Sequence, residues 1–226
     1  YLYAAAQHRL VNNFNLVDIY VGMGGVPHGP VRDYLPVAPG ARTLAMRLLR
    51  ENGFKGTGRL IALQMGANQM HRAWPVQSFA ALAAALCTSG NYEIVVLGTA
   101  AEEALTAEFC RTFHRPFINL AGKTSMVDLA AVLKQCVLLV SNDTGTVHIA
   151  SAVGTKVLGL YFSTAYYSET APYGQDNVIL QPMRTCAPCS LKTICADISC
   201  RNDLDVSSVA GTAQAMVEGT PAPVAT

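Results

Sequence analysis

One short segment combines the side chains and the backbone that an anion-binding site needs: Asp143, Thr144, Gly145, Thr146 and His148. The threonines offer hydroxyl groups, and the glycine leaves backbone N–H groups uncovered. Asp143 suits the N-cap of a following helix, and capping alone could explain its presence. A cap requires neither the glycine nor a histidine five residues after the aspartate. The segment therefore predicts a seat for an anion such as a phosphate.

The flanking residues predict the elements that position this segment. Residues 137–141 form an apolar run suited to a strand buried on both faces, and residues 147–153 follow a helical pattern. A strand that turns directly into a helix leaves unpaired N–H groups at the positive end of the helix dipole. Such a helix start binds anions readily. We expect His148 in its first turn, facing the same edge.

The rest of the chain alternates between strand and helix patterns. Strands are predicted at 59–65, 93–97, 117–120, 137–141, 156–161 and 177–180, and helices at 41–52, 75–89, 100–113, 125–135, 147–153 and 206–218. This alternation predicts an α/β fold, a Rossmann-like parallel sheet with helices on both faces. Ligands of such sheets bind at the carboxyl ends of the strands. The residues that follow each strand are therefore the candidates for binding.

Four further residues follow the first three strands. Gly66 would let a ligand approach the backbone closely, and Arg72 would offer a guanidinium to a phosphate, although a solvated loop arginine is an equal alternative. Glu102 could hold sugar or ribose hydroxyls, but a carboxylate in a first helical turn is already explained by the helix dipole. Lys123 could reach a phosphate or simply face solvent. All four stay candidates for ligand binding.

Composition narrows the class of protein. About half of the 226 residues are hydrophobic and 14% are charged, so a sizeable core is possible. The net charge is +1 and no basic stripe stands out, which argues against nucleic-acid binding. No apolar run reaches the roughly 18 to 20 residues of a membrane span. The first nine residues do not resemble a signal peptide.

Four cysteines cluster near the C-terminal end: Cys186, Cys189, Cys195 and Cys200. They could hold a structural zinc ion or an iron–sulfur cluster. Their spacing is shorter than in the usual four-cysteine zinc ribbon, so free or oxidised thiols are an equal alternative.

Three segments together resemble glycosyltransferase family 9, the ADP-heptose:lipopolysaccharide heptosyltransferases. Residues 141–163 resemble the family's Asp-Thr-Gly-x-x-His turn with its Ala-rich helix and second strand. Gln64-Met-Gly-Ala followed by Arg72-Ala-Trp-Pro resembles its Gly-Ala-Ser and Lys-x-Trp-Pro region, and residues 120–133 resemble its Gly-Lys-Thr-Ser-Leu-x-Glu-Leu segment. The resemblance extends over about residues 40–220.

The resemblance implies the C-terminal, donor-binding domain of a GT-B glycosyltransferase. It implies that Asp143, Thr144, Gly145 and His148 contact the pyrophosphate and sugar of a nucleotide-diphosphate donor such as ADP-heptose. Arg72 falls where the family has a donor-phosphate lysine, and Glu102 near an acid that contacts donor hydroxyls. The acceptor would be lipopolysaccharide core or a related glycan. No cofactor is required, and the catalytic base belongs to an N-terminal domain, so we assign no base here.

The same resemblance predicts how the chain divides into domains. Residues 1–40 would be the end of the N-terminal domain and its connection, residues 41–220 the donor domain with a Cys-rich insertion at 186–200, and residues 221–226 a disordered tail. The chain begins without Met inside a helical pattern, which suggests a fragment that is inactive alone. A cytoplasmic location is expected, at or near the inner membrane. The alternatives are a non-catalytic nucleotide-sugar-binding module or another GT-B enzyme such as a sugar-nucleotide epimerase.

Overall fold

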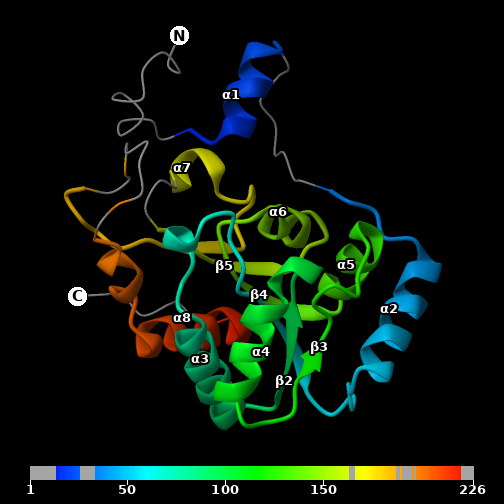
Figure 1. Cartoon of the computed structure of the whole chain (residues 1–226). Coiled ribbons are helices and arrows are strands. Elements are labelled where there is room, and N and C mark those ends of the chain that lie inside the picture. Colours follow the sequence, from blue (N-terminus) through cyan, green and yellow to red (C-terminus); the bar gives the residue numbers. More distant parts are fainter. Residues whose placement is uncertain are drawn as a thin grey trace.

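The computed structural model describes residues 14–25, 34–162, 166–186, 189, 195 and 197–219. A six-stranded parallel sheet lies at its centre, in the order β3-β2-β1-β4-β5-β6 (Figure 1). The strands are β1 (Arg59–Gln64), β2 (Tyr92–Leu97), β3 (Ile118–Asn119), β4 (Cys136–Asn142), β5 (Lys156–Leu160) and β6 (Asn177–Leu180). The predicted α/β class with a parallel sheet is confirmed.

Helices cover both faces of the sheet. They are α1 (Leu16–Met23), α2 (Pro39–Glu51), α3 (Val76–Ser89), α4 (Glu103–Thr112), α5 (Met126–Leu133), α6 (Gly145–Ala152), α7 (Tyr167–Thr170) and α8 (Val206–Glu218). Residues of α3, α4 and α8 share one apolar cluster with the sheet, and residues of α2, α5 and α6 share a second. In the described part of the chain no helix is both long and apolar enough to cross a membrane.

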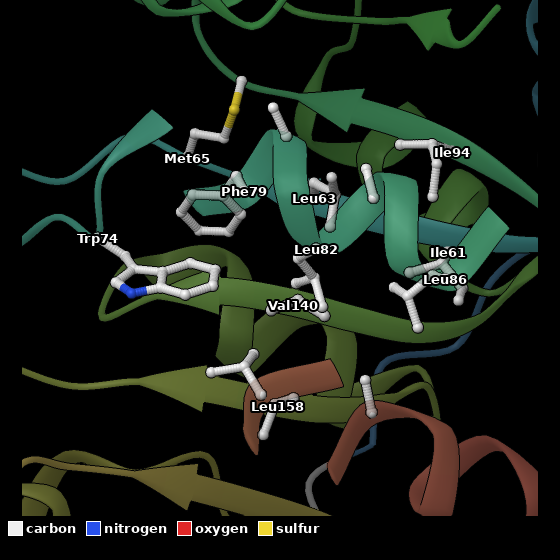
Figure 2. Packing of buried hydrophobic residues seen from close by; sticks show 14 of the residues in the cluster. Ile61, Leu63, Met65, Trp74, Phe79, Leu82, Leu86, Ile94, Val140 and Leu158 are labelled. Carbon is white, nitrogen blue, oxygen red and sulfur yellow. The ribbon is translucent and has the colours of Figure 1, made fainter. Parts of the chain in front are cut away.

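Trp74 lies in the first of these cores rather than on the domain surface. Its ring packs edge-on against Phe79 with centroids 5.1 Å apart, beside Leu82 and Val140 (Figure 2). The indole nitrogen donates a hydrogen bond to the carbonyl oxygen of Leu204 at 3.0 Å. The loop between β1 and α3 is therefore anchored near its end, by a residue that lies in the core.

Most predicted elements lie within two residues of their observed positions, and one differs more. The helix expected at 100–113 is a 3-10 turn, η3 (Ala100–Glu102), followed by α4. Short helices η2 (Met70–Arg72), α7 and η4 (Ser199–Asn202) were not expected. Helix α1 lies within the predicted domain connection at 1–40. Residues 1–13 and 26–33 and the tail at 221–226 lie outside the described residues, and the domain boundary near residue 40 stays a prediction.

The strand order reverses between β1 and β4, and one side chain joins their carboxyl ends. Asn142 is fully buried at the end of β4. Its Oδ1 accepts a hydrogen bond from the Trp74 N–H at 2.9 Å, and its Nδ2 donates to the carbonyl oxygens of Met65 at 2.7 Å and Gly66 at 3.4 Å. Both ends of the β1–α3 loop are therefore tied to β4, at the position where doubly wound sheets bind ligands.

Replacement of Asn142 by Ala should destabilise the protein by at least about 2 kcal/mol, because it leaves buried backbone groups of Met65 and Trp74 without partners. Urea unfolding followed by circular dichroism measures this. Asn68→Ala is the matched control: Asn68 lies on the same loop and is exposed, so it should change stability by less than about 0.5 kcal/mol. Equal effects of the two substitutions would contradict the assigned role of Asn142.

Candidate anion-binding site

The start of α6 lies at the carboxyl end of β4, and its N-cap is Thr144. Asp143 was predicted as the cap, and this is wrong. The Asp143 carboxylate is instead paired with the guanidinium of Arg72, reached from the loop after β1. The Thr144 hydroxyl lies 3.3 Å from the Ser141 hydroxyl and makes no capping bond. The Val147 N–H bonds to the carbonyl oxygen of Thr144 at 3.2 Å, and no side chain caps the start of α6. The N–H groups before Val147 are the ones that a helix leaves for a ligand or solvent.

The Arg72–Asp143 pair joins the two strands at the point of reversal. The Arg72 side chain is 23% exposed and that of Asp143 12%, so the pair is largely removed from solvent. Only Nη2 of Arg72 contacts the carboxylate, whereas Nε is buried without a hydrogen-bond partner among the described residues. Burial lowers the pKa of Arg72, although an arginine still stays charged at neutral pH. Arg72 thus carries a positive charge and an unused N–H donor, and it pairs with the residue just before the N-cap of α6.

Tyr161 follows β5 and lies beside the same arginine. It is fully buried and donates a hydrogen bond to the carbonyl oxygen of Thr170 at 3.2 Å. Burial raises the pKa of Tyr161, while the nearby Arg72 charge acts in the opposite direction. The phenol therefore stays neutral at physiological pH, and an uncharged side chain lies beside the guanidinium.

Gly145 is the first residue of α6 and is exposed. A Cβ atom built on it would meet nothing within 4 Å, and its φ is not in the left-handed region. Nothing within the described chain therefore requires a glycine at this position. The close approach of a ligand to the backbone is a reason that remains. Thr146 is half-buried and His148 is exposed on the same helix.

Glu102 lies in a narrow space at the ends of β1 and β2. Its Oε2 accepts a hydrogen bond from the Thr99 N–H at 2.6 Å, and the Gln64 amide lies 3.3 to 3.4 Å from both carboxylate oxygens. A Cβ atom on Gly66 would lie 1.4 Å from Oε1, and one on Gly98 2.7 Å from Oε2. Gly66 was predicted to admit a ligand. In the structure Gly66 lies against the Glu102 carboxylate, and its contact with a ligand stays a prediction.

Lys123 does not contact the other candidates in the structure. It is exposed, and its Nζ contacts Oδ1 of Asn52 at 2.6 Å, just after α2.

Two buried residues that sequence reasoning missed, Asn142 and Gln64, bond to the residues around the site. The sequence did contain a clue to them, because each is a polar residue at the end of an otherwise apolar strand. A polar side chain in a buried strand needs a hydrogen-bond partner.

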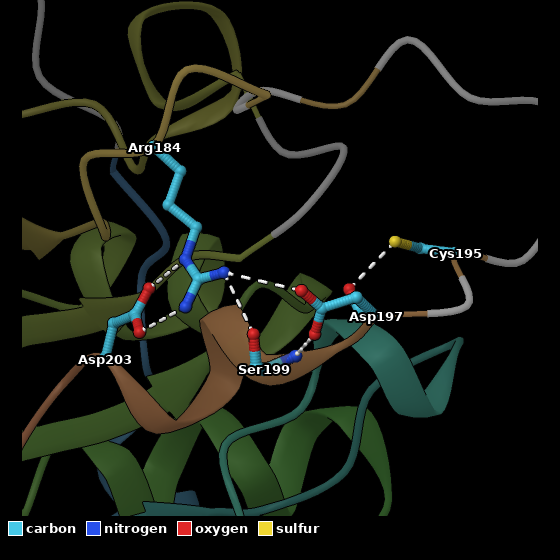
Figure 3. Close-up of polar contacts among 5 residues, drawn as sticks. All are labelled: Arg184, Cys195, Asp197, Ser199 and Asp203. Atoms are coloured by element: carbon cyan, nitrogen blue, oxygen red, sulfur yellow. Dashed lines mark hydrogen bonds and ion pairs between the residues drawn. The ribbon is translucent and has the colours of Figure 1, made fainter.

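The four clustered cysteines follow β6. Within the described residues, no group of three or more His, Cys, Asp or Glu side chains is arranged to hold a metal ion. The Cys195 thiol points toward Asp197 and contacts its carbonyl oxygen at 2.8 Å (Figure 3). Burial raises the pKa of Cys200, and nearby Cys189 and Cys186 add to the effect. The Cys200 thiol is therefore close enough to those of Cys186 and Cys189 to interact with them electrostatically.

An arginine instead organises this region. Arg184 donates from Nε and Nη2 to the two carboxylate oxygens of Asp203, and from Nη1 to the Ser199 hydroxyl at 2.9 Å (Figure 3). Asp197 lies 3.8 Å from the same guanidinium. These contacts attach the Cys-rich segment to η4, immediately before α8.

Gly145→Ala should separate ligand contact from stability. Alanine is the better helix former, so the free energy of unfolding should stay unchanged or rise by up to about 1 kcal/mol. Anion binding should weaken, because the added methyl group occupies the open space in front of the helix start. Thermal unfolding and calorimetric titration with ADP measure the two effects. Unchanged titration in a variant that folds normally would remove Gly145 from the site.

The structural metal at Cys186, Cys189, Cys195 and Cys200 stays a prediction that the described geometry does not support. Metal analysis of protein purified under reducing conditions tests it directly. If the four thiolates hold a structural metal, the protein should contain about one equivalent of zinc or iron per chain, and a stoichiometry near zero would refute the site. A stoichiometry near one, abolished by Cys189→Ser and unaffected by Cys110→Ser, would show that the thiols do assemble.

Comparisons with known proteins identify the family and the fold. The family model described as glycosyltransferase family 9 (heptosyltransferase) matches residues 3–197. Lipooligosaccharide heptosyltransferase 2 of Haemophilus influenzae is 30% identical over 141 residues, which are 60% of this chain and 40% of that protein.

Two solved structures show the same fold. ADP-heptose LPS heptosyltransferase II of Escherichia coli superposes with a TM-score of 0.70 at 19% identity, covering 87% of this chain and 56% of that one. The family 9 glycosyl transferase of Veillonella parvula reaches 0.78 at 20%, covering 93% and 62%. The chain thus spans about half the length of these relatives. The family model covers more than half of the chain, and this match assigns the family. The chain belongs to glycosyltransferase family 9.

Proposed function

We propose that this chain is the donor-binding half of an inverting glycosyltransferase. The enzyme transfers heptose from ADP-heptose to lipopolysaccharide core or a related glycan. Membership of family 9 and relatives described as heptosyltransferases support the choice of donor and acceptor. The observation that carries the proposal is the arrangement of Arg72 and the uncapped start of α6 at the reversal between β1 and β4.

The charges along the sheet edge match the chemistry of such a donor. Glu102 lies at the end of β2, Arg72 after β1, and Asp143 after β4, and these three strands are neighbours in the order β2-β1-β4. The sequence of charges is negative, positive, negative. A nucleotide-diphosphate sugar offers hydroxyls, a diphosphate and hydroxyls in the same order. Glu102 would accept from the ribose, Arg72 would bind the diphosphate, and Asp143 would accept from the sugar.

The reaction requires stabilisation of the diphosphate that leaves the sugar carbon. The N–H groups at the start of α6 and the guanidinium of Arg72 supply it, because both face the bridging and terminal phosphate oxygens in this arrangement. The acceptor hydroxyl attacks from the opposite side of the sugar ring, which inverts the configuration, and a base takes its proton. No residue of this chain is assigned as that base. His148 contacts the donor from the exposed side of α6.

The acceptor also determines where the enzyme works. Lipopolysaccharide core is attached to a lipid, so the enzyme would act in the cytoplasm at the inner face of the membrane. The contacts with this lipid-linked glycan are not assigned to residues of the chain.

Calorimetric titration tests the donor site directly. The chain should bind ADP-heptose and ADP, and more weakly UDP and GDP, with a dissociation constant that His148→Ala raises by about tenfold. His114→Ala is the matched control, because His114 is exposed in the loop after α4 and should leave binding unchanged.

Two outcomes would contradict the proposal. Failure of the wild-type chain to bind any of these nucleotides refutes the donor site. If His148→Ala and His114→Ala weaken nucleotide binding equally, the donor site does not lie at the start of α6. Binding of ADP-heptose by a chain whose full-length protein transfers no sugar would instead favour a non-catalytic binding module.

A further inference from the structure

We propose that Asp143 competes with the donor's diphosphate for Arg72, and that this competition makes the site prefer a nucleotide-diphosphate sugar over the bare nucleotide diphosphate. Asp143 thereby acts as a specificity-determining residue in addition to its contact with the sugar. The inference rests on the proposed function, and its experiment separates the failure of one from the failure of the other.

The first argument is position. The Asp143 carboxylate immediately precedes the N-cap of α6, so a negative charge stands beside the seat that attracts anions. It is tolerated there because Arg72 neutralises it. A diphosphate at the start of α6 needs the same guanidinium and would meet the same carboxylate at close range. The single guanidinium of Arg72 cannot neutralise both the Asp143 carboxylate and the diphosphate.

The second argument is the form of the ion pair. Arg184, elsewhere in this chain, holds Asp203 with both Nε and Nη2, the two-point contact that fixes an arginine in place (Figure 3). Arg72 uses Nη2 alone on Asp143 and leaves its buried Nε without a partner among the described residues. A buried donor without an acceptor is unfavourable, and a phosphate oxygen would satisfy it. The Arg72–Asp143 contact is therefore suited to exchange.

The third argument is what the exchange leaves behind. If the diphosphate takes Arg72, Asp143 becomes a carboxylate that is 12% exposed and has lost its cation. An unpaired charge in such surroundings is strongly unfavourable. A sugar attached to the diphosphate would donate hydroxyl hydrogen bonds to the freed carboxylate and offset the loss. Bare ADP would not. The donor is thus favoured over the product that remains after transfer.

The experiment compares Asp143→Asn with the wild-type chain in titrations with pyrophosphate, ADP and ADP-heptose. Asparagine keeps the shape and removes the charge. Pyrophosphate and ADP should bind about fivefold more tightly to the variant, whereas ADP-heptose should bind no better than before. The preference for ADP-heptose over ADP should therefore fall by about fivefold or more. A residue that only contacts the sugar would leave the binding of pyrophosphate and ADP unchanged.

A double-variant cycle with Arg72→Met identifies the mechanism. If Asp143 acts by occupying Arg72, the gain in pyrophosphate affinity should vanish when Asp143→Asn is made in the Arg72→Met chain. Simple repulsion between Asp143 and phosphate would preserve the gain. Glu51→Gln is the control for charge alone, because Glu51 also pairs with an arginine, Arg47, on the exposed surface of α2. It should leave all three affinities unchanged.

Each outcome decides between the readings. Tighter binding of pyrophosphate and ADP by Asp143→Asn, lost with Arg72→Met, supports the competition. Unchanged or weaker binding overturns it while the donor site stands, and so does a gain that persists without Arg72. If the wild-type chain binds no probe, the proposed function fails and the inference fails with it. Thermal unfolding checks that each variant folds, and Asp143→Ser replaces Asp143→Asn if the latter does not.

Discussion

The site depends on one buried amide. Asn142 ends the central strand β4 and satisfies backbone groups at both ends of the loop that carries Arg72. Without these bonds the loop would have to find other partners for a buried N–H and a buried carbonyl. Because Asn142 immediately precedes Asp143, the same residue also fixes where the carboxylate stands. The position of the cation and the position of its counter-ion therefore follow from a single side chain.

The start of α6 shows how such a site can be electropositive and stable at once. Uncapped helix N–H groups next to a buried guanidinium would repel one another unless an anion is close. Asp143 supplies that anion from within the chain, which explains why it pairs with Arg72 instead of capping the helix. The Arg72–Asp143 pair keeps the positive groups in place without a ligand. In the proposed site, an anionic ligand must bind Arg72 more favourably than Asp143 does.

The fold was largely predictable, because strand and helix periodicity act locally. Strand β6 and helix α8 begin and end at the predicted residues. The partners within the site were not predictable, because they depend on which loops meet at the reversal of strand order. Local reasoning made Asp143 a cap, and only tertiary structure supplies the arginine 71 residues earlier that overrides it. Family resemblance identified Arg72 and Glu102, but not the buried Asn142 that positions the loop.

The glycines show why residue type alone could not define the site. Gly66 and Gly145 both follow strands, and both were read as places where a ligand approaches the backbone. Gly66 lies beside the Glu102 carboxylate, so an added Cβ atom there would require that side chain to move. Gly145 faces open space, and a Cβ atom there would meet nothing within 4 Å. The same residue type therefore has a neighbour within the chain at one strand end and none at the other. The proposed diphosphate site uses the open one.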